Sequence, residues 1–419
     1  MMRRIVNFEN DPAFKGLVAV IALYIFANIY SAISSLANAG VFTGGDFEGF
    51  RSDAVVILIN LFLVILFYLA SVFLYRNLKG KFREAELFPS NVMSLGWFVA
   101  AIQIIFFLYL TFGEVGLDQL KGQASFASYF QYLFVPDYLF LTYYAFGRGA
   151  RLFYPNLLLY LASTSVRGVS GGFIFLIFFE VVAAFQKSKW TLVSLALLII
   201  VLLSPFIYEL RNLVRSASPA YLFSTPWSEL AATVFESAYL NIHFLDSLHD
   251  VGDFVLMRLQ HLSSPVAIYN HLDLFWLGDI KGTFLSFLFD GGPQRSLLGE
   301  SFYSSPLLSE YLTISMFPTP YGSWFTHPSL VGWLWVDPFS FPLLVVYCIA
   351  LLSLNLFLVK KIGGDAYALA CSFIFFLVFI MNGWFGPYIS TIQAFVILLV
   401  LSRVARAARN FSSSLARSA

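Results

Sequence analysis

Arg167 stands alone among small residues in the segment "STSVRGVSGG", residues 163–172, which joins two long apolar stretches. A guanidinium binds phosphate through two parallel hydrogen bonds, so the chemistry of this arginine would be anion binding. The hydroxyl of Ser165 and the nearby glycines would let a bulky anion reach further hydrogen-bond donors. The alternative is that Arg167 only contacts the phosphates of membrane lipids.

A second set of polar residues lies in the segment 236–265, "ESAYLNIHFLDSLHDVGDFVLMRLQHLSSP". Steps of three and four residues place one group of them on a single face of a predicted helix, namely Tyr239, His243, Asp246, Asp250 and Asp253. In the functional interpretation this face lines a water-filled cavity, Arg258 is a second phosphate ligand, and His261 or an acid such as Asp250 is a base. The alternative is a helix lying on the membrane with its charged face in water. Gly252 could interrupt this helix, and the spacing matches no strong metal-ligand signature.

The third segment is "FPTPYGSWFTHPSLVGWLWVDP", residues 317–338, whose prolines and glycines predict that no regular helix forms. Its tryptophans, Trp324, Trp333 and Trp335, fit an aromatic belt at the membrane interface. Alternatively, aromatic side chains such as Tyr321 and Trp324 stack on sugar rings in a glycan groove. His327 is the histidine of this segment that could act as a base. Three more cations are candidates for substrate binding: Arg211, Arg215 and Arg295.

The composition excludes a soluble protein. Of the 419 residues, 59% are hydrophobic and only 12% are charged, whereas soluble domains carry about 25% charged residues. We therefore predict an all-α polytopic membrane protein. The net charge of +1 and the lack of a basic stripe argue against a nucleic-acid partner. Cys348 and Cys371 lie inside apolar segments, which favours buried packing over a disulfide or metal pair.

Apolar runs of roughly 17–25 residues are long enough to cross a bilayer. The sequence contains ten candidate runs: 17–36, 54–75, 92–113, 128–146, 152–166, 168–186, 190–208, 339–359, 366–382 and 386–402. Pro155 and the glycines around Arg167 make the fifth and sixth short or bent. Glu180 lies within the sixth run, and we favour a local polar contact over a functional role for it.

The basic residues alternate along this series. Every second connection is rich in Lys and Arg, and these connections hold 17 of the 25. The positive-inside rule then makes both termini cytoplasmic. The chain is predicted to be a single membrane domain, 1–419, with one large external segment, 209–338, between the seventh and eighth spans. A segment of this length must form a cap or membrane-embedded pieces, and it contains all five histidines.

This layout resembles bacterial O-antigen and oligosaccharide repeat-unit polymerases of the Wzy type. The matching pieces are "TSVRGVSGGFIFLIF", "FVLMRLQHL" and "FPTPYGSWFTHPSLVGWLW". The chain departs from the family pattern at one place. In the family a glutamate often follows the glycine of the third piece, whereas this chain has Ser323 and Trp324 there. The resemblance implies a GT-C-like fold of about ten transmembrane helices with a large helical external loop.

The resemblance also implies an activity. Such an enzyme is a glycosyltransferase of the bacterial inner membrane that joins undecaprenyl-diphosphate-linked repeat units on the periplasmic face. It needs no nucleotide sugar, metal or other cofactor, and a chain-length regulator is a candidate partner beside the membrane lipids. Arg167 and Arg258 match the essential external arginines of that family. Two alternatives stay open: an O-antigen ligase, for which His327 matters more, and a flippase or transporter of a lipid-linked sugar.

Overall fold

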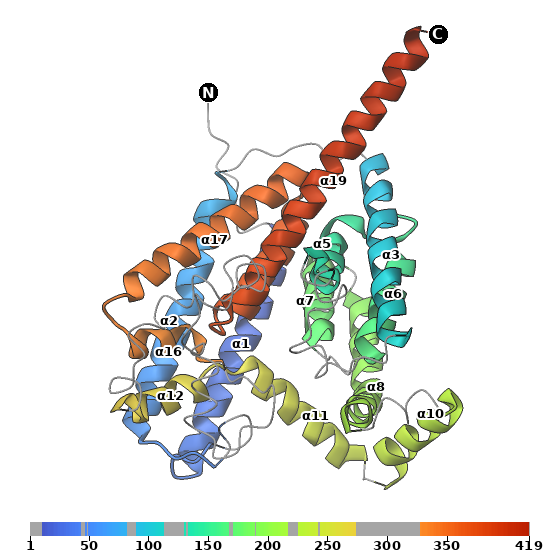
Figure 1. The fold of residues 1–419 in the computed structure, drawn as a ribbon. Helices are drawn as coiled ribbons and strands as arrows, with labels where there is room; N and C mark the ends of the chain where they lie inside the picture. The colour runs from blue at the N-terminus through green and yellow to red at the C-terminus, as the bar shows by residue number, and fades with distance from the viewer. Residues whose placement is uncertain are drawn as a thin grey trace.

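The computed structural model describes residues 11–42, 47, 49–81, 89–112, 130, 133–166, 171–188, 190–216, 225–241, 244–273 and 327–418. Within these ranges the regular elements are helices, and the prediction of an all-α protein is confirmed. Five of the helices are long and apolar enough to cross a membrane: Pro12–Ala37, Ala54–Lys79, Met93–Leu110, Phe341–Ile362 and Phe385–Ala407. The chain is therefore a helical, multi-pass membrane protein (Figure 1).

The helices follow one another in the order α1 Pro12–Ala37, α2 Ala54–Lys79, α3 Pro89–Phe112, α5 Pro136–Gly147, α6 Phe153–Val166, α7 Gly171–Lys187, α8 Trp190–Ser216, α10 Trp227–Phe235, η2 Glu236–Asn241, α11 Phe244–Leu259, α12 Ser263–Asn270, α16 Ser329–Val336, α17 Phe341–Ile362, α18 Ala366–Phe375, η6 Phe376–Ile380 and α19 Phe385–Ser418. Of these, η2 and η6 are short π-helices.

Several predicted spans coincide with helices that are shorter than a bilayer is thick. α5 has 12 residues, α6 has 14 and α7 has 17. At a rise of about 1.5 Å per residue, even the longest of them covers only about 26 Å of a hydrocarbon core of about 30 Å. The predicted ninth span, 366–382, consists of the ten residues of α18 and the five of η6. The count of ten spans stays a prediction.

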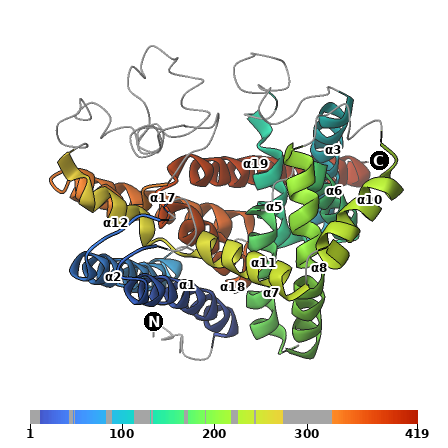
Figure 2. The ribbon, with the colours of Figure 1, turned by 90° about the horizontal axis from the view of Figure 1, so that it is seen from below.

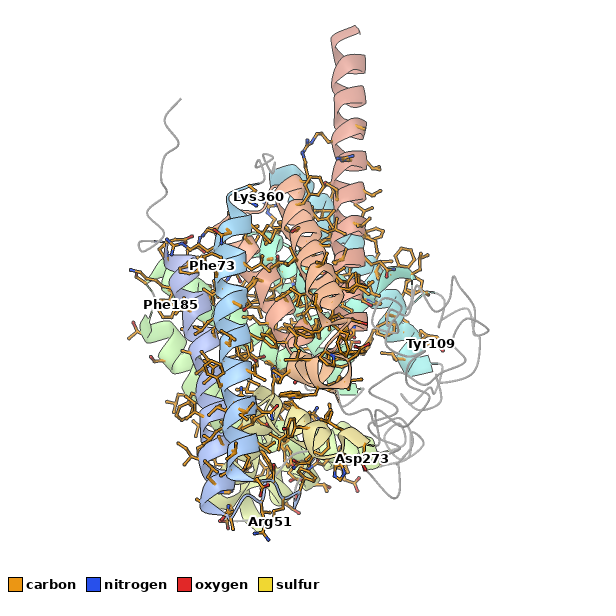
Figure 3. All side chains as sticks on the ribbon, turned by 90° about the vertical axis from the view of Figure 1, so that its left-hand side faces the viewer. Arg51, Phe73, Tyr109, Phe185, Asp273 and Lys360 are labelled. Atoms are coloured by element: carbon orange, nitrogen blue, oxygen red, sulfur yellow. The ribbon has the colours of Figure 1, made fainter. Side chains whose placement is uncertain are left out.

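α1 and α2 form an antiparallel pair with defined ends. Asp11 accepts hydrogen bonds from the backbone N–H groups of Ala13 and Phe14, which caps α1. The same carboxylate pairs with Lys79 at the end of α2, with 2.6 Å between Nζ and Oδ2. We call this the basic end of the molecule, because Lys360 lies toward it in Figure 3, whereas Arg51 and Asp273 lie at the opposite end.

α7 packs closely against α1. A Cβ atom at Gly16 would lie 2.7 Å from the Cα of Val182, so only glycine allows this approach of the two backbones. Further along α1, Tyr24 meets Phe178 with 5.7 Å between ring centroids. The two helices therefore run antiparallel, and α7 begins away from the basic end.

α18 and η6 enter the bundle from the basic end and turn back inside it. The chain reverses at residues 381–384 and leaves as α19, which continues well beyond the other helices (Figure 1). Asn355 of α17 donates hydrogen bonds to the carbonyl of Ser372 and the hydroxyl of Tyr388, which joins α17, α18 and α19. Figure 2 shows these helices beside α1 and α2, with α11 between the two halves of the bundle.

Candidate active site

The end of α11 reaches the middle of the bundle. His261 follows the last turn of this helix, and its Nδ1 lies 2.7 Å from the hydroxyl of Tyr68. The imidazole also contacts the ring of Tyr24, with 5.4 Å between centroids. Tyr24 and Tyr68 lie near the middle of the membrane-spanning helices α1 and α2. This part of the segment 209–338 is therefore an embedded piece and not a cap.

The backbone leaves the helical conformation here, at a depth where lipid cannot satisfy its polar groups. The N–H of His261 donates to Oδ1 of Asn28 at 2.7 Å, and the side chain of Asn28 in turn donates to the carbonyl of Tyr24. Gln260 accepts the N–H groups of Leu262 and Ser263, both at 3.0 Å, which caps α12. Interrupted helices occur inside membranes only where such partners exist, and they often mark functional sites.

We predict that Asn28→Leu destabilises the protein by about 1–3 kcal/mol, because the buried N–H of His261 would lose its acceptor. Asn77→Leu is the matched control, since Asn77 is exposed and its side chain donates only to the carbonyl of Phe73, one turn back. Thermal unfolding in detergent should show a lower midpoint for the first variant only. Equal midpoints for both would contradict the role given to Asn28.

His261 is a poor candidate for the base. His261 is 5% exposed, and burial lowers its pKa to about 3, as it does for His327, so the pKa does not separate these two histidines. Nδ1 is already engaged by Tyr68. Because Tyr68 occupies this nitrogen, we interpret His261 as the residue that fixes the end of α11 against α1 and α2.

His327 lies within electrostatic reach of Arg258, in the last turn of α11, and of His261, which follows that helix. Its pKa is lowered to about 3, first by burial and then by electrostatic interactions with Arg258 and His261. Nδ1 of His327 is buried and has no hydrogen-bond partner among the described residues. The ring stacks on Trp384, with 4.1 Å between centroids and 25° between planes. The structure thus brings Arg258, His261 and His327 together.

We call this group, Arg258, His261, His327 and Trp384, the Arg258–His327 site. Arg258 lies in the last turn of α11 and is exposed, so its guanidinium can meet an anion. The site combines a cation, a neutral imidazole with an unused nitrogen, and an aromatic ring. Trp384 was not among the predicted site residues. The feature of the sequence that could have indicated it is the turn sequence "MNGW", residues 381–384, which interrupts an apolar run.

The helix predicted to carry Tyr239, His243, Asp246, Asp250 and Asp253 on one face is formed only in part, as α11. α11 continues through Gly252 without interruption. Tyr239 belongs to the separate helix η2 and donates to the carbonyl of Leu202, so the single continuous helix was wrong. His249 and Asp253 form an exposed pair, with 3.3 Å between Nδ1 and Oδ2. Asp250 lies on α11 two turns before Arg258, and its side chain is outside the described atoms.

Two predictions about the segment 317–338 were wrong for its described part. Residues 329–336 form the regular helix α16, although no helix was expected. Trp333 is buried and donates to the carbonyl of Gly383, and Trp335 donates to Oδ1 of Asn60 at 2.8 Å. Neither is in a lipid-facing belt, because both indole N–H groups have partners inside the protein.

The structure places only some of the remaining candidates. Arg211 and Arg215 lie within α8, and their side chains are outside the described atoms. Ser165 is half-buried in the last turn of α6. The other candidates, Arg167, Arg295, Tyr321 and Trp324, lie outside the described residues. The start of α7, four residues after Arg167, is directed away from the basic end.

Two predictions outside the site are confirmed. Glu180 makes local polar contacts, since its carboxylate accepts hydrogen bonds from Tyr144 and Arg148. Cys348 and Cys371 are both free and buried. Within the described part of the chain, no group of three or more His, Cys, Asp or Glu residues is placed to hold a metal ion.

No protein-family model matches the chain, and no curated protein or solved structure is similar to it. The function is therefore argued from the Arg258–His327 site and its place in the fold.

The lowered pKa of His327 predicts a pH-dependent stability. The imidazole of the unfolded chain takes up a proton near its usual pKa of 6.5, whereas the folded one does so only near 3. The free energy of unfolding should therefore fall by up to about 1.4 kcal/mol per pH unit as the pH is lowered from about 6 toward 4. Urea unfolding of the wild type and of His327→Gln measures this. The variant should show a shallower pH dependence, and an unchanged slope would contradict the lowered pKa.

Proposed function

We propose that the protein is a membrane glycosyltransferase that polymerises undecaprenyl-diphosphate-linked oligosaccharide repeat units. The proposal places the reaction on the outer face of the bacterial inner membrane. It rests on the Arg258–His327 site together with the resemblance of the sequence to repeat-unit polymerases. Metal ions and nucleotides have no part in the proposed reaction.

The observation that carries the proposal is that Arg258, at the inner end of α11, lies within electrostatic reach of the buried imidazole nitrogen of His327. α11 approaches this point from the end of the bundle opposite the basic end (Figure 1). By the positive-inside rule, the basic end with Lys79, Lys360 and Lys361 faces the cytoplasm. A lipid-linked diphosphate in the outer leaflet would therefore reach the guanidinium without crossing the membrane.

In the proposed reaction, the hydroxyl oxygen of the acceptor sugar attacks the anomeric carbon of the donor glycan. The bond between that carbon and the diphosphate oxygen breaks, and its electron pair leaves with the lipid diphosphate. Arg258 stabilises the negative charge that develops on the phosphate oxygens, and Arg167 is its proposed partner. His327 accepts the proton of the hydroxyl at Nδ1 or Nε2. A new glycosidic bond and a free lipid diphosphate result.

The second candidate is an O-antigen ligase, which transfers the same donor to a sugar of the lipid A core. The closeness of His327 to Arg258 favours this alternative as well, because both reactions need a base beside the leaving group. The acceptor distinguishes the two enzymes.

The test is to incubate the purified protein with a synthetic lipid-diphosphate repeat unit, without metal or nucleotide. A ladder of products is the expected result. Addition of a single glycan to a core acceptor, with no ladder, would support the ligase. Movement of the lipid between leaflets of a vesicle with no glycan change would overturn both and support a transporter.

A further inference from the structure

We infer that Trp384, which the proposed reaction does not otherwise use, is a positioning residue that fixes the imidazole of His327 beside Arg258. The inference rests on the proposed function for its catalytic consequence, but the geometry on which it depends can be measured without any reaction. It concerns the turn between η6 and α19, which lies far along the chain from α11.

The turn that carries Trp384 is joined to the start of α16. The N–H groups of Ser329 and Leu330 donate to the carbonyls of Asn382 and Met381, both at 3.1 Å. Gly383 has a φ of +74°, and a Cβ atom there would lie 3.1 Å from the backbone of Ser329. His327 is only two residues before Ser329. Since the turn and the start of α16 move as one unit, the indole and the imidazole keep their relative positions.

The part of the chain that the structure describes supplies no hydrogen bond to orient the imidazole through Nδ1. In most catalytic histidines a carboxylate or carbonyl on one ring nitrogen fixes the ring and its tautomer. Here Nδ1 is buried without a partner, and the described contact of the ring is its stack on Trp384 at 4.1 Å. Trp384 is held in turn by the ring of Phe379, nearly perpendicular to it at 5.8 Å. The indole therefore takes the place of the missing hydrogen bond.

The stack also affects the charge that His327 would carry during the reaction. The charged and titratable groups that act on the imidazole, Arg258 and His261, both come from the end of α11, and both lower its pKa. The described residues of α16 and of the turn 381–384 have no ionisable side chain. The negative face of an indole favours a cation above it. Trp384 is thus the described neighbour that stabilises the imidazolium formed by proton uptake.

The first test compares Trp384→Leu with Trp384→Phe, which keeps an aromatic face. Trp384→Leu should lower kcat for ladder formation by about 10–100-fold, because a displaced base loses its alignment, with an unchanged KM for the donor. The acid limb of its pH profile should move to lower pH, since the imidazolium has lost a stabilising partner. Trp384→Phe should recover most of the rate. Trp97→Leu is the control, because Trp97 is 60% exposed on α3 and belongs to no described site.

The second test is spectroscopic and needs no turnover. In the NMR spectrum of protein with isotope-labelled histidine, the imidazole signal of His327 is identified as the one that disappears in His327→Gln. In the wild type it should be shifted upfield by the indole, and Trp384→Leu should abolish this shift. An absent shift, an unaltered kcat, or a raised KM at constant kcat in Trp384→Leu would each overturn the inference. If the wild type forms no ladder while the upfield shift is present, the proposed function fails and the stacked geometry stands.

Discussion

Arg258→Ala should stop chain growth, with turnover lowered by about 10²–10³-fold, while the protein still inserts and folds. The guanidinium lies within electrostatic reach of His327 and would stabilise the charge on the departing diphosphate more in the transition state than in the bound donor. Folding should survive, because Arg258 is exposed at the end of α11 and is not part of the core. The measurement is the product ladder formed by purified variant and wild type under the same conditions.

Two further variants make this result specific. Arg258→Lys should recover only part of the rate, because an ammonium cannot reproduce the two-pronged contact with phosphate. Arg51→Ala is the matched control, since Arg51 is an exposed arginine at the end of the molecule opposite the basic end (Figure 3). Normal ladders from Arg258→Ala would remove this residue from the mechanism. Arg167→Ala, in the other proposed arginine, should behave as Arg258→Ala does.

His327→Gln should lower kcat by about 10²–10⁴-fold, the usual loss when a general base is removed. The donor should still bind, because Arg258 is intact, so KM should change little. The rate constants follow from ladder formation at several donor concentrations. Since glutamine cannot accept the proton, no pH between 5 and 8 should restore the rate.

His261→Gln distinguishes a base from a structural histidine. Nδ1 of His261 is engaged by Tyr68, and the ring packs against both Tyr68 and Tyr24. This variant should therefore lower thermal stability, by about 1–3 kcal/mol for a disrupted buried hydrogen bond, and keep most of its kcat. A larger loss of kcat in His261→Gln than in His327→Gln would reverse the roles given to the two histidines.

The membrane class and several helices could be predicted from the sequence alone. Long apolar runs carry their own signal, because a chain that crosses lipid must pair its backbone polar groups within each helix. The structure confirms such helices at α1, α2, α17 and α19. The burial of Cys348 and Cys371 and the local contacts of Glu180 could also be predicted, because these residues lie inside apolar runs and their surroundings follow from that position.

The site depended on contacts that no local pattern contains. His261 meets Tyr68 and Asn28, which are 193 and 233 residues away along the chain. Arg258 and His261 are neighbours in the sequence, but His327 and Trp384 are separated from them by a long segment, so no local pattern could join them to Arg258. The sequence also could not indicate that α11 ends in the middle of the bundle. That position is stabilised by the hydrogen bonds that Asn28 of α1 and Gln260 accept from the interrupted backbone, and by the bond between Tyr68 of α2 and the imidazole of His261. Only the packing of the helices against one another therefore decides it.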